Sequence, residues 1–252
     1  MAPEPGTHRD LPPFDRRFFE EPDARAVLGE GALGGKATGL VRAAFLLQRK
    51  EPGRGLEGLH LRIPRFLVLA TGLFETFLEH NGLTEVIQET PRDDHLAHAF
   101  VSAELPIEIV GDLRTLVSRI GRPLAVRSSS LLEDAAAHPF AGVYLTKMVP
   151  NRESDTSRRF QALAEAVKLV WASTFFAGAR AYAHSIGRDA ADERMAVVIQ
   201  EVVGQAWGDR FYPEISGVAK SHDYYPFGRA TPEDGVVHLL SLIHISEPTR
   251  PY

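Results

Sequence analysis

The chain has 252 residues, 44% of them hydrophobic and 24% charged, so it can bury a substantial core as one large or two small domains. Its formal net charge of −5 argues against a nucleic-acid surface, which needs clustered excess lysine and arginine. The absence of cysteine excludes a disulfide framework, a thiolate metal site and a cysteine nucleophile.

The N-terminus and the hydropathy pattern set the expected location. No apolar run approaches the roughly 20 residues that a membrane span needs. The first residues, MAPEPGTHRDLPP, carry proline and charge where a signal peptide needs an apolar segment. We therefore expect a soluble, cytoplasmic protein that contacts no membrane.

The chain is expected to begin with a poorly ordered segment. Residues up to about Pro13 are expected to be disordered, and Phe14–Phe19 to dock as a short aromatic-anchored element. After Leu28, four glycines within seven residues predict a flexible turn. From Ala37 a helical pattern with one apolar face follows.

The next segments predict a strand and then several helices. Phe66–Leu69 is a short apolar run that indicates a strand, and Thr71 is expected to cap the helix that follows it. The stretch Thr84–Arg119 is expected to be mainly helical, with breaks near Pro91 and Pro106.

The second half combines one long helix with strands. Ser157–Ser173 places its apolar residues on one face, which is typical of an amphipathic core helix, and we expect Trp171 to serve packing rather than chemistry. Met195–Val203 and Ile215–Lys220 indicate strands. The pattern predicts a protein of the α/β (α+β) class.

The segment Leu124–Thr146, LAVRSSSLLEDAAAHPFAGVYLT, outlines an anion site. A short apolar strand leads into Arg127, which can grip a phosphate with two hydrogen bonds. Ser128, Ser129 and Ser130 add hydroxyl and N–H groups. A second loop returns with Gly142, where the backbone can approach a phosphate closely.

Acidic residues and a histidine in the same segment leave alternatives open. Arg127 can instead pair with Glu133 or Asp134 as an ordinary ion pair. The two acids can approach a Mg²⁺-bound phosphate or simply be solvated. His138 lies near the inferred phosphates, but we expect a solvated loop histidine there rather than a catalytic one.

A second candidate for an anion site is the string GALGGKA. It does not fit the G-x-x-x-x-G-K-[ST] template, because Glu30 stands at the first glycine and Ala37 at the Ser/Thr position. What remains is a turn at Gly34 and Gly35 that leads Lys36 into a helix N-terminus, where N–H groups favour an anion. A solvated surface lysine is the alternative.

These segments together resemble the ATP-binding domain of phosphoenolpyruvate synthase and pyruvate phosphate dikinase. That family has a VRSS strand end, an acidic ED pair and an FAG loop in this order. Three further segments match in family order: LGEGALGGKATGL, IPRFLVLATGLFETFLEHNGL, and MAVVIQEVVG followed by ISGVAKS. The resemblance covers about Leu28 to Leu239 and implies an ATP-grasp-like nucleotide-binding module, incomplete at its C-terminus.

The resemblance also implies an activity. Such enzymes are phosphotransferases that use ATP and Mg²⁺ to pass a phosphoryl group through a histidine to pyruvate. No histidine here has the glycine-rich context of the family's phosphohistidine, so the phosphohistidine and pyruvate-binding domains are expected outside this chain, and the chain alone is expected to be inactive. Related modules serve dikinase-type enzymes with antibiotic or glucan substrates. A non-catalytic nucleotide sensor is the alternative of a different class.

The run Val197–Val203 is where an adenine is expected. Backbone groups of Glu201 to Val203 can read the purine edge between apolar side chains, and by resemblance this is the hinge strand of an ATP-grasp fold. The alternative is an ordinary core strand whose Gln200 faces solvent. Gln200 and Glu201 alternate in direction, so both cannot point into one pocket.

The expected site is therefore a set of two phosphate-binding cations and their neighbours. By resemblance, Lys36 and Arg127 stabilise the transferred phosphoryl group. The expected nucleotide contacts are Gly34, Gly35, Lys36, Arg127, Ser128, Ser129, Gly142, Thr146, Gln200, Glu201 and Val203. The metal ligands remain unassigned and are expected beyond residue 240.

The domain limits follow from the same comparison. Residues 1–27 are expected to be an N-terminal extension and 28–239 a partial ATP-binding domain. The string SLIHISEPTR resembles the translation of a transposon-type sequencing adapter. Residues 240–252 are therefore expected to be a non-native tail that does not pack against the domain.

Overall fold

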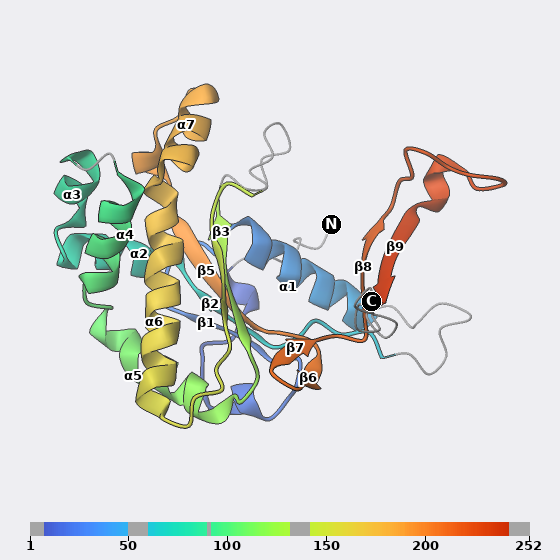
Figure 1. Cartoon of the computed structure of the whole chain (residues 1–252), viewed down its shortest axis with the longest axis horizontal. Helices are drawn as coiled ribbons and strands as arrows, with labels where there is room; N and C mark the ends of the chain where they lie inside the picture. Colours follow the sequence, from blue (N-terminus) through green and yellow to red (C-terminus); the bar gives the residue numbers. More distant parts are fainter. Residues whose placement is uncertain (1–7, 50–59, 90–91, 132–141, 242–252) are drawn as a thin grey trace, which may run out of the picture. The chain divides into compact units, whose positions relative to one another are not determined.

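The computed structural model describes residues 8–49, 60–89, 92–131 and 142–241 (Figure 1). The chain divides into two compact units, Met1–Val202 and Val203–Tyr252. Each unit is described by itself.

A five-stranded mixed sheet forms the centre of the first unit. Its strands stand in the order β1 (Arg25–Leu28), β2 (Phe66–Leu69), β5 (Met195–Glu201), β3 (Leu124–Ser130) and β4 (Thr146–Val149). β1 and β2 are parallel, and the other neighbouring pairs are antiparallel. β3 therefore runs in the same direction as β1 and β2. These three strands end on the same side of the sheet, which we call the carboxyl end.

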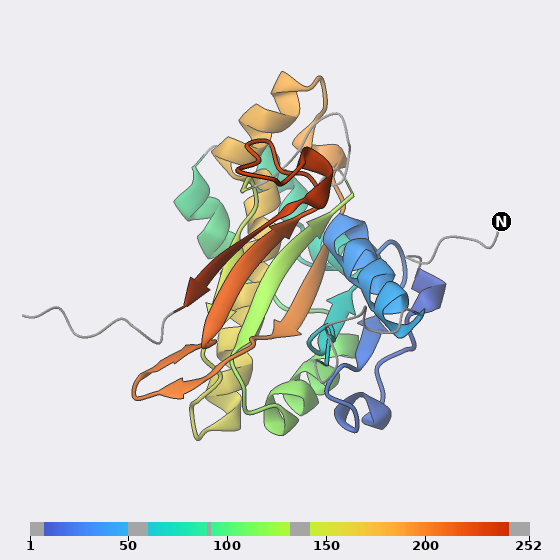
Figure 2. The same cartoon turned by 90° about the vertical axis from the view of Figure 1, so that its right-hand side faces the viewer.

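Helices cover both faces of this sheet (Figures 1 and 2). The helix α1 (Gly34–Arg49) packs against β3 and β5 on one face. The other face carries α2 (Thr71–His80), α3 (Leu83–Glu89), α4 (Asp93–Ser102), α5 (Ile107–Arg119), α6 (Thr156–Ala172) and α7 (Ala177–Ser185). Short 3-10 turns occur at His8–Asp10, Arg16–Phe19, Ser173–Phe175, Ala190–Asp192 and Pro232–Asp234.

Each face of the sheet has its own apolar core. Under α1 the core is small and aliphatic, with Ala37 and Val41 against Val68 and Val198. Under the other helices it is larger and aromatic. There Trp171 is fully buried, and its ring centroid lies 4.9 Å from that of Phe77. The prediction that Trp171 is a packing residue is confirmed.

Most of the predicted elements are confirmed. The predicted strand Phe66–Leu69 is β2, and the predicted helical stretch from Thr84 to Arg119 forms α3, α4 and α5, with the break before α5 at Pro106. Pro91, the other predicted break, lies outside the described residues. The predicted amphipathic helix is α6, which begins after Asp155, whose carboxylate accepts a hydrogen bond from the Ser157 N–H. The N-terminal aromatic element forms too, with ring centroids 5.0–5.7 Å apart.

The prediction of disorder up to Pro13 is wrong for residues 8–13. The Val27 N–H donates to the Pro12 carbonyl at 3.0 Å, and the Phe14 N–H donates to the Val27 carbonyl at 3.1 Å. Leu11 is buried. The segment is ordered because it pairs along the outer side of β1, a long-range contact that its proline-rich composition does not reveal.

The predicted capping role of Thr71 is also wrong. The helix α2 begins at Thr71 itself, and its N-cap residue is Ala70, which makes no side-chain cap. The Thr71 hydroxyl instead accepts a hydrogen bond from the Ala32 N–H at 2.9 Å. Thr71 therefore fixes the glycine-rich loop after β1 rather than its own helix.

The second unit consists of two antiparallel strand pairs, β6 (Gln205–Trp207) with β7 (Arg210–Tyr212), and β8 (Ile215–Lys220) with β9 (Val236–Ser241). The strand β8 has the predicted bounds. The register pairs Leu240 with Ser216, so β9 includes the first two residues of the segment predicted to be a non-native tail. Residues 242–252 lie outside the described residues.

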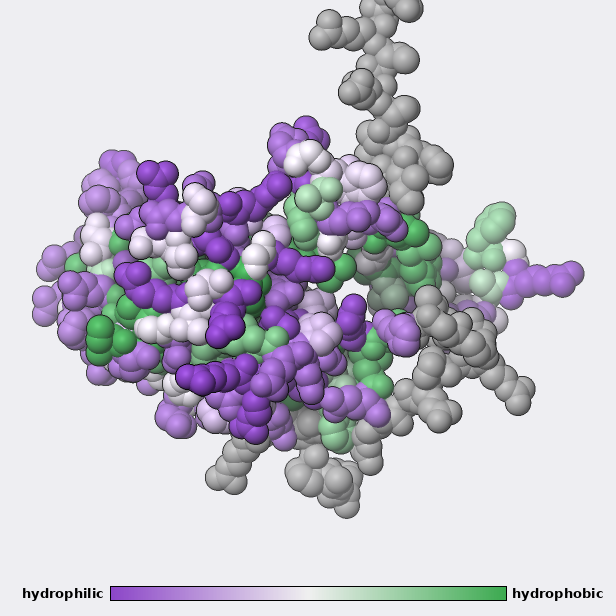
Figure 3. All heavy atoms as spheres, turned by 90° about the horizontal axis from the view of Figure 1, so that it is seen from below, coloured by the Kyte–Doolittle hydropathy of each residue, from purple (hydrophilic) through white to green (hydrophobic). Residues whose placement is uncertain are grey.

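The surface of the helical side of the first unit is mostly hydrophilic, with smaller apolar patches between (left part of Figure 3). In the part of the chain that the structure describes, no single helix is long and apolar enough to span a membrane. A bent pair, Thr156–Phe175 with Ala177–Ser185, meets the length and composition test.

Candidate nucleotide-binding site

Consecutive serines at the end of β3 connect the sheet to the start of α1. The Lys36 ammonium group donates to both the carbonyl and the hydroxyl oxygen of Ser128, at 3.1 Å each. The Ser129 hydroxyl donates to the Leu33 carbonyl at 2.8 Å and accepts from the Ala37 N–H at 3.0 Å. Both serines are fully buried. The N-terminus of α1 is therefore held against the carboxyl end of β3.

Gly34 makes this contact sterically possible. It has a φ of +71°, and a Cβ atom at this position would lie 1.8 Å from the Ser129 carbonyl oxygen. No side chain larger than hydrogen fits without displacing the end of β3. The glycine thus sets the closest approach between the loop and the strand.

The loop between β1 and α1 is held in place at several points. Besides the Ala32–Thr71 hydrogen bond, the Thr71 N–H donates to the Ala32 carbonyl at 3.1 Å, and the Gly72 N–H donates to the Glu30 carbonyl at 2.9 Å. His8 Nε2 lies 2.8 Å from the Gly29 carbonyl oxygen. The glycines were predicted to make a flexible turn between β1 and α1. In the structure, this loop is held by hydrogen bonds to the first residues of α2.

Arg127 lies in the middle of β3, on the face of the sheet that α1 partly covers. It stands opposite Thr146 on β4 and Val198 on β5. Because side chains two residues apart on a strand share a face, Ala125 and Ser129 lie on the same side of the sheet as Arg127. Met148 stands opposite Ala125 on β4 and therefore lies on this side too. Thr146 and Met148 are exposed, so this face is open toward β4. This face therefore carries the polar residues Arg127 and Thr146 next to the exposed apolar side chain of Met148.

Gln200 joins the same face and does not face solvent. Its amide oxygen lies 3.4 Å from Arg127 Nη1, a long hydrogen bond, and its amide nitrogen donates to the Pro64 carbonyl at 3.3 Å. The residue is 8% exposed. The alternative ion pairs of Arg127, with Glu133 or Asp134, involve residues outside the described part of the chain.

Glu201 points to a different partner, as the strand alternation predicts. Its carboxylate forms an ion pair with Arg65 at 3.2 Å. The Glu201 N–H donates to the Arg65 carbonyl, and the Val202 N–H to the Pro123 carbonyl, at 3.0 Å each. These two N–H groups are therefore already used within the protein. Val203 belongs to the second unit, where its side chain is 56% exposed.

The sequence did not reveal the role of Glu193, which lies two residues before β5. Its Oε1 atom accepts hydrogen bonds from the Ser130 hydroxyl at 2.8 Å and from the Leu131 N–H at 3.2 Å. Burial raises the pKa of the Glu193 carboxyl above its ordinary value, against the opposing effect of these hydrogen bonds. A glutamate just before a strand usually indicates a solvated residue, so no local signal pointed to this contact.

The remaining predicted residues are only partly described. Gly142 has a φ of +78°, a conformation that favours glycine, and no atom of the described residues would lie within 4 Å of a Cβ there. Glu133, Asp134 and His138 lie outside the described residues. Among the residues that are described, no three His, Asp or Glu side chains are grouped to hold a metal ion.

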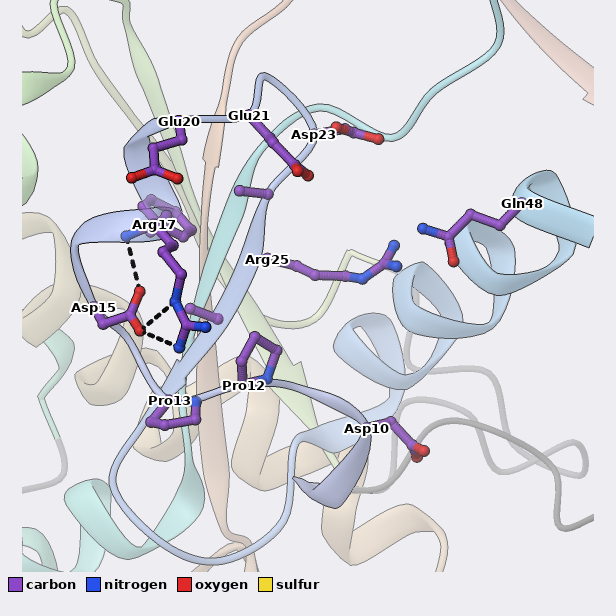
Figure 4. A pocket seen from close by; sticks show the side chains of 13 residues that line it. Asp10, Pro12, Pro13, Asp15, Arg17, Glu20, Glu21, Asp23, Arg25 and Gln48 are labelled. Atoms are coloured by element: carbon purple, nitrogen blue, oxygen red, sulfur yellow. Dashed lines mark hydrogen bonds and ion pairs between the residues drawn. The ribbon is translucent and has the colours of Figure 1, made fainter.

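A cleft of about 400 Å³ lies elsewhere, beside the start of β1 and the end of α1 (Figure 4). The Arg25 side chain extends across it toward Gln48. At its rim the Arg17 guanidinium bonds Asp15 and lowers the pKa of that carboxyl. Because β1 starts here and ends at the glycine-rich loop, this cleft is at the opposite end of the strand from Lys36.

The arrangement at the carboxyl end defines a class of protein. A mixed sheet, a glycine-rich loop leading into a helix N-terminus, and a lysine and an arginine on neighbouring elements are typical of a nucleotide-binding α/β domain. Residues 30–242 match the model of the family described as the pyruvate phosphate dikinase AMP/ATP-binding domain. The chain belongs to this family.

The chain is also similar to one curated protein at low sequence identity. The chain is 28% identical over 163 residues to a protein named "Uncharacterized phosphotransferase YvkC" from Bacillus subtilis (strain 168). The match covers 65% of this chain and 17% of that protein. The chain thus matches less than a fifth of the relative's length.

Proposed function

We propose that the first unit binds ATP with its phosphates at the carboxyl end of the sheet, between Lys36 and Arg127. The observation that carries this proposal is the contact between Lys36 and Ser128. Ser128 directly follows Arg127 in β3, so this contact holds the Lys36 ammonium group close to the strand position of Arg127. The start of α1 adds the favourable end of a helix dipole. An ATP-grasp-like module, as proposed from the sequence, is compatible with this arrangement.

The base would lie on the open face of β3, β4 and β5. Ala125 and the exposed Met148 offer an apolar surface next to Thr146 and Gln200. Polarisable methionine packs well against a flat aromatic ring. Since the Glu201 and Val202 N–H groups and both ends of the Gln200 amide are already bonded, the purine edge would be read by backbone carbonyl groups near the end of β5.

The proposed reaction is that of a dikinase-type phosphotransferase resembling phosphoenolpyruvate synthase. A phosphoryl group of ATP passes to a histidine on another domain and then to pyruvate. The Lys36 and Arg127 side chains would bind the phosphate oxygens, orient them and neutralise the charge that shifts between them during transfer. Mg²⁺ would screen the same oxygens when bound, but the described residues assign it no ligands, so no step depends on it here.

Calorimetric titration tests the proposed site through the phosphates. ATP is expected to bind at least tenfold more tightly than AMP, because the additional phosphates contact Lys36 and Arg127 through charge-assisted hydrogen bonds of about 1.5–3 kcal/mol each. Tripolyphosphate is expected to compete with ATP. Equal affinities for ATP and AMP, or no ATP binding at all, would contradict the proposal.

A further inference from the structure

The buried Glu193 carboxylate is only half satisfied. The side chain is 3% exposed, and its Oε1 atom accepts both hydrogen bonds, from Ser130 and Leu131. Its Oε2 atom is also buried and has no hydrogen-bond partner among the described residues. A buried carboxylate oxygen without a partner is costly, because it loses its hydration and gains nothing in return.

The environment of Glu193 does not remove this cost. The positive charge of Arg188 lowers the pKa of the Glu193 carboxyl, but burial raises it more. The Arg194 side chain is engaged elsewhere, with its Nε atom on Glu75, while the Arg194 backbone N–H lowers the pKa of the Glu193 carboxyl. The adjacent cavity of about 370 Å³ is lined by two acidic and two basic residues besides Glu193, namely Asp189, Asp192, Arg188 and Arg194. The pKa is therefore higher in the folded than in the unfolded chain, so ionisation of Glu193 opposes folding at neutral pH.

The position of Glu193 indicates what it contributes instead. Ser128 bonds Lys36, Ser129 bonds the start of α1, and Ser130 bonds Glu193. Glu193 thus holds the last residue of β3, and the N–H of the residue after it, from the side of β5. Without this anchor, the strand end that carries both other serines would depend on its contacts with α1 and on the sheet itself.

We propose that Glu193 is a positioning residue for the phosphate site: it holds the end of β3 so that Ser128 and Ser129 present Lys36 and the start of α1 to ATP. This inference rests on the proposed function. Glu193 itself does not touch the nucleotide. Its two hydrogen bonds transmit the constraint through the backbone of β3.

The test compares Glu193→Ala and Glu193→Gln with the wild-type chain in two measurements. Calorimetry at pH 7.5 should show ATP affinity reduced about three- to tenfold in folded Glu193→Ala, which loses the Oε1 acceptor, the range expected for losing one or two hydrogen bonds. Affinity should stay close to wild type in Glu193→Gln, whose amide oxygen can still accept both hydrogen bonds. Thermal unfolding should show the Tm of Glu193→Gln rising relative to wild type as the pH rises from about 4.5 to 8. The reason is that only the wild-type chain must keep a buried charge.

Matched variants separate positioning from general structural support. Asp192→Asn removes an exposed carboxylate from the same cavity and should leave ATP affinity at the wild-type level. Ser130→Ala removes a donor to Glu193 and should lower affinity, with the double variant showing less than the sum of the two losses. A purely structural role predicts lower stability with unchanged affinity in the folded variants.

The outcomes distinguish this inference from the function on which it rests. If the wild-type chain binds no ATP, the proposed function is wrong and the inference falls with it. If the wild-type chain binds ATP and folded Glu193→Ala and Ser130→Ala bind it equally well, only the positioning role is overturned.

Discussion

Replacing Lys36 or Arg127 with alanine should weaken ATP binding by about one to two orders of magnitude. Each side chain is expected to form charge-assisted hydrogen bonds with phosphate, worth about 1.5–3 kcal/mol, and about 1.4 kcal/mol corresponds to a tenfold change in affinity. The fold should survive, since both residues are only partly buried and bond polar groups of the sheet, Ser128 and Gln200. Calorimetric titration with ATP measures the effect.

Arg122→Ala is the matched control. It also removes one positive charge, but from an exposed side chain just before β3 begins, at the other end of the strand. Its affinity should stay within about twofold of wild type, because surface charges far from a ligand are screened by salt. If folded Lys36→Ala and Arg127→Ala variants bind ATP as well as Arg122→Ala does, the assignment of the phosphate site is wrong.

The second large effect is expected for Gly34→Ala. A left-handed backbone costs a residue with a Cβ about 1–2 kcal/mol, and forcing an atom into a packed contact costs about 1–3 kcal/mol more. The new methyl group would meet the Ser129 carbonyl oxygen at 1.8 Å, so the start of α1 and the end of β3 must separate. We expect a stability loss of about 2–5 kcal/mol, with weaker ATP binding, measured by urea denaturation and calorimetry.

Gly39→Ala provides the control within the same helix. Gly39 lies inside α1, and a methyl group there would meet no atom of another described residue within 4 Å, apart from its own helix backbone and chain neighbours. Alanine is a better helix former than glycine by about 1 kcal/mol, so this variant should be equally or more stable than wild type. A Gly34→Ala variant as stable as Gly39→Ala would show that close approach to β3 is not needed.

The elements with strong local signals could be predicted from the sequence. Phe66–Leu69 is a continuous apolar run shortly after a proline, and α6 has a regular apolar face, so both were located correctly. The N-terminal residues 8–13 were not, because their order depends on pairing with Val27, a contact across the chain. Thr71 fits the pattern of a helix cap, but the loop N–H of Ala32 is its actual partner.

In the candidate site, too, residues in a local motif could be predicted, while residues that depend on contacts distant in sequence could not. Lys36, Arg127 and the serines could be named because their motif is local and resembles a family. Glu193 could not, because its contact with Ser130 joins positions 63 residues apart and nothing in ADERMA distinguishes it from a solvated glutamate. The packing of Gln200 depends on the strand order β2-β5-β3, which local patterns do not reveal.

The most direct test of the central claim is a crystal structure of the chain with a non-hydrolysable ATP analogue. The phosphates should lie within hydrogen-bond distance of the Lys36 ammonium and Arg127 guanidinium groups, with the purine on the open face beside Met148 and Gln200. Nucleotide bound instead in the cleft between Arg25 and Gln48, or phosphates that contact neither cation, would contradict the account.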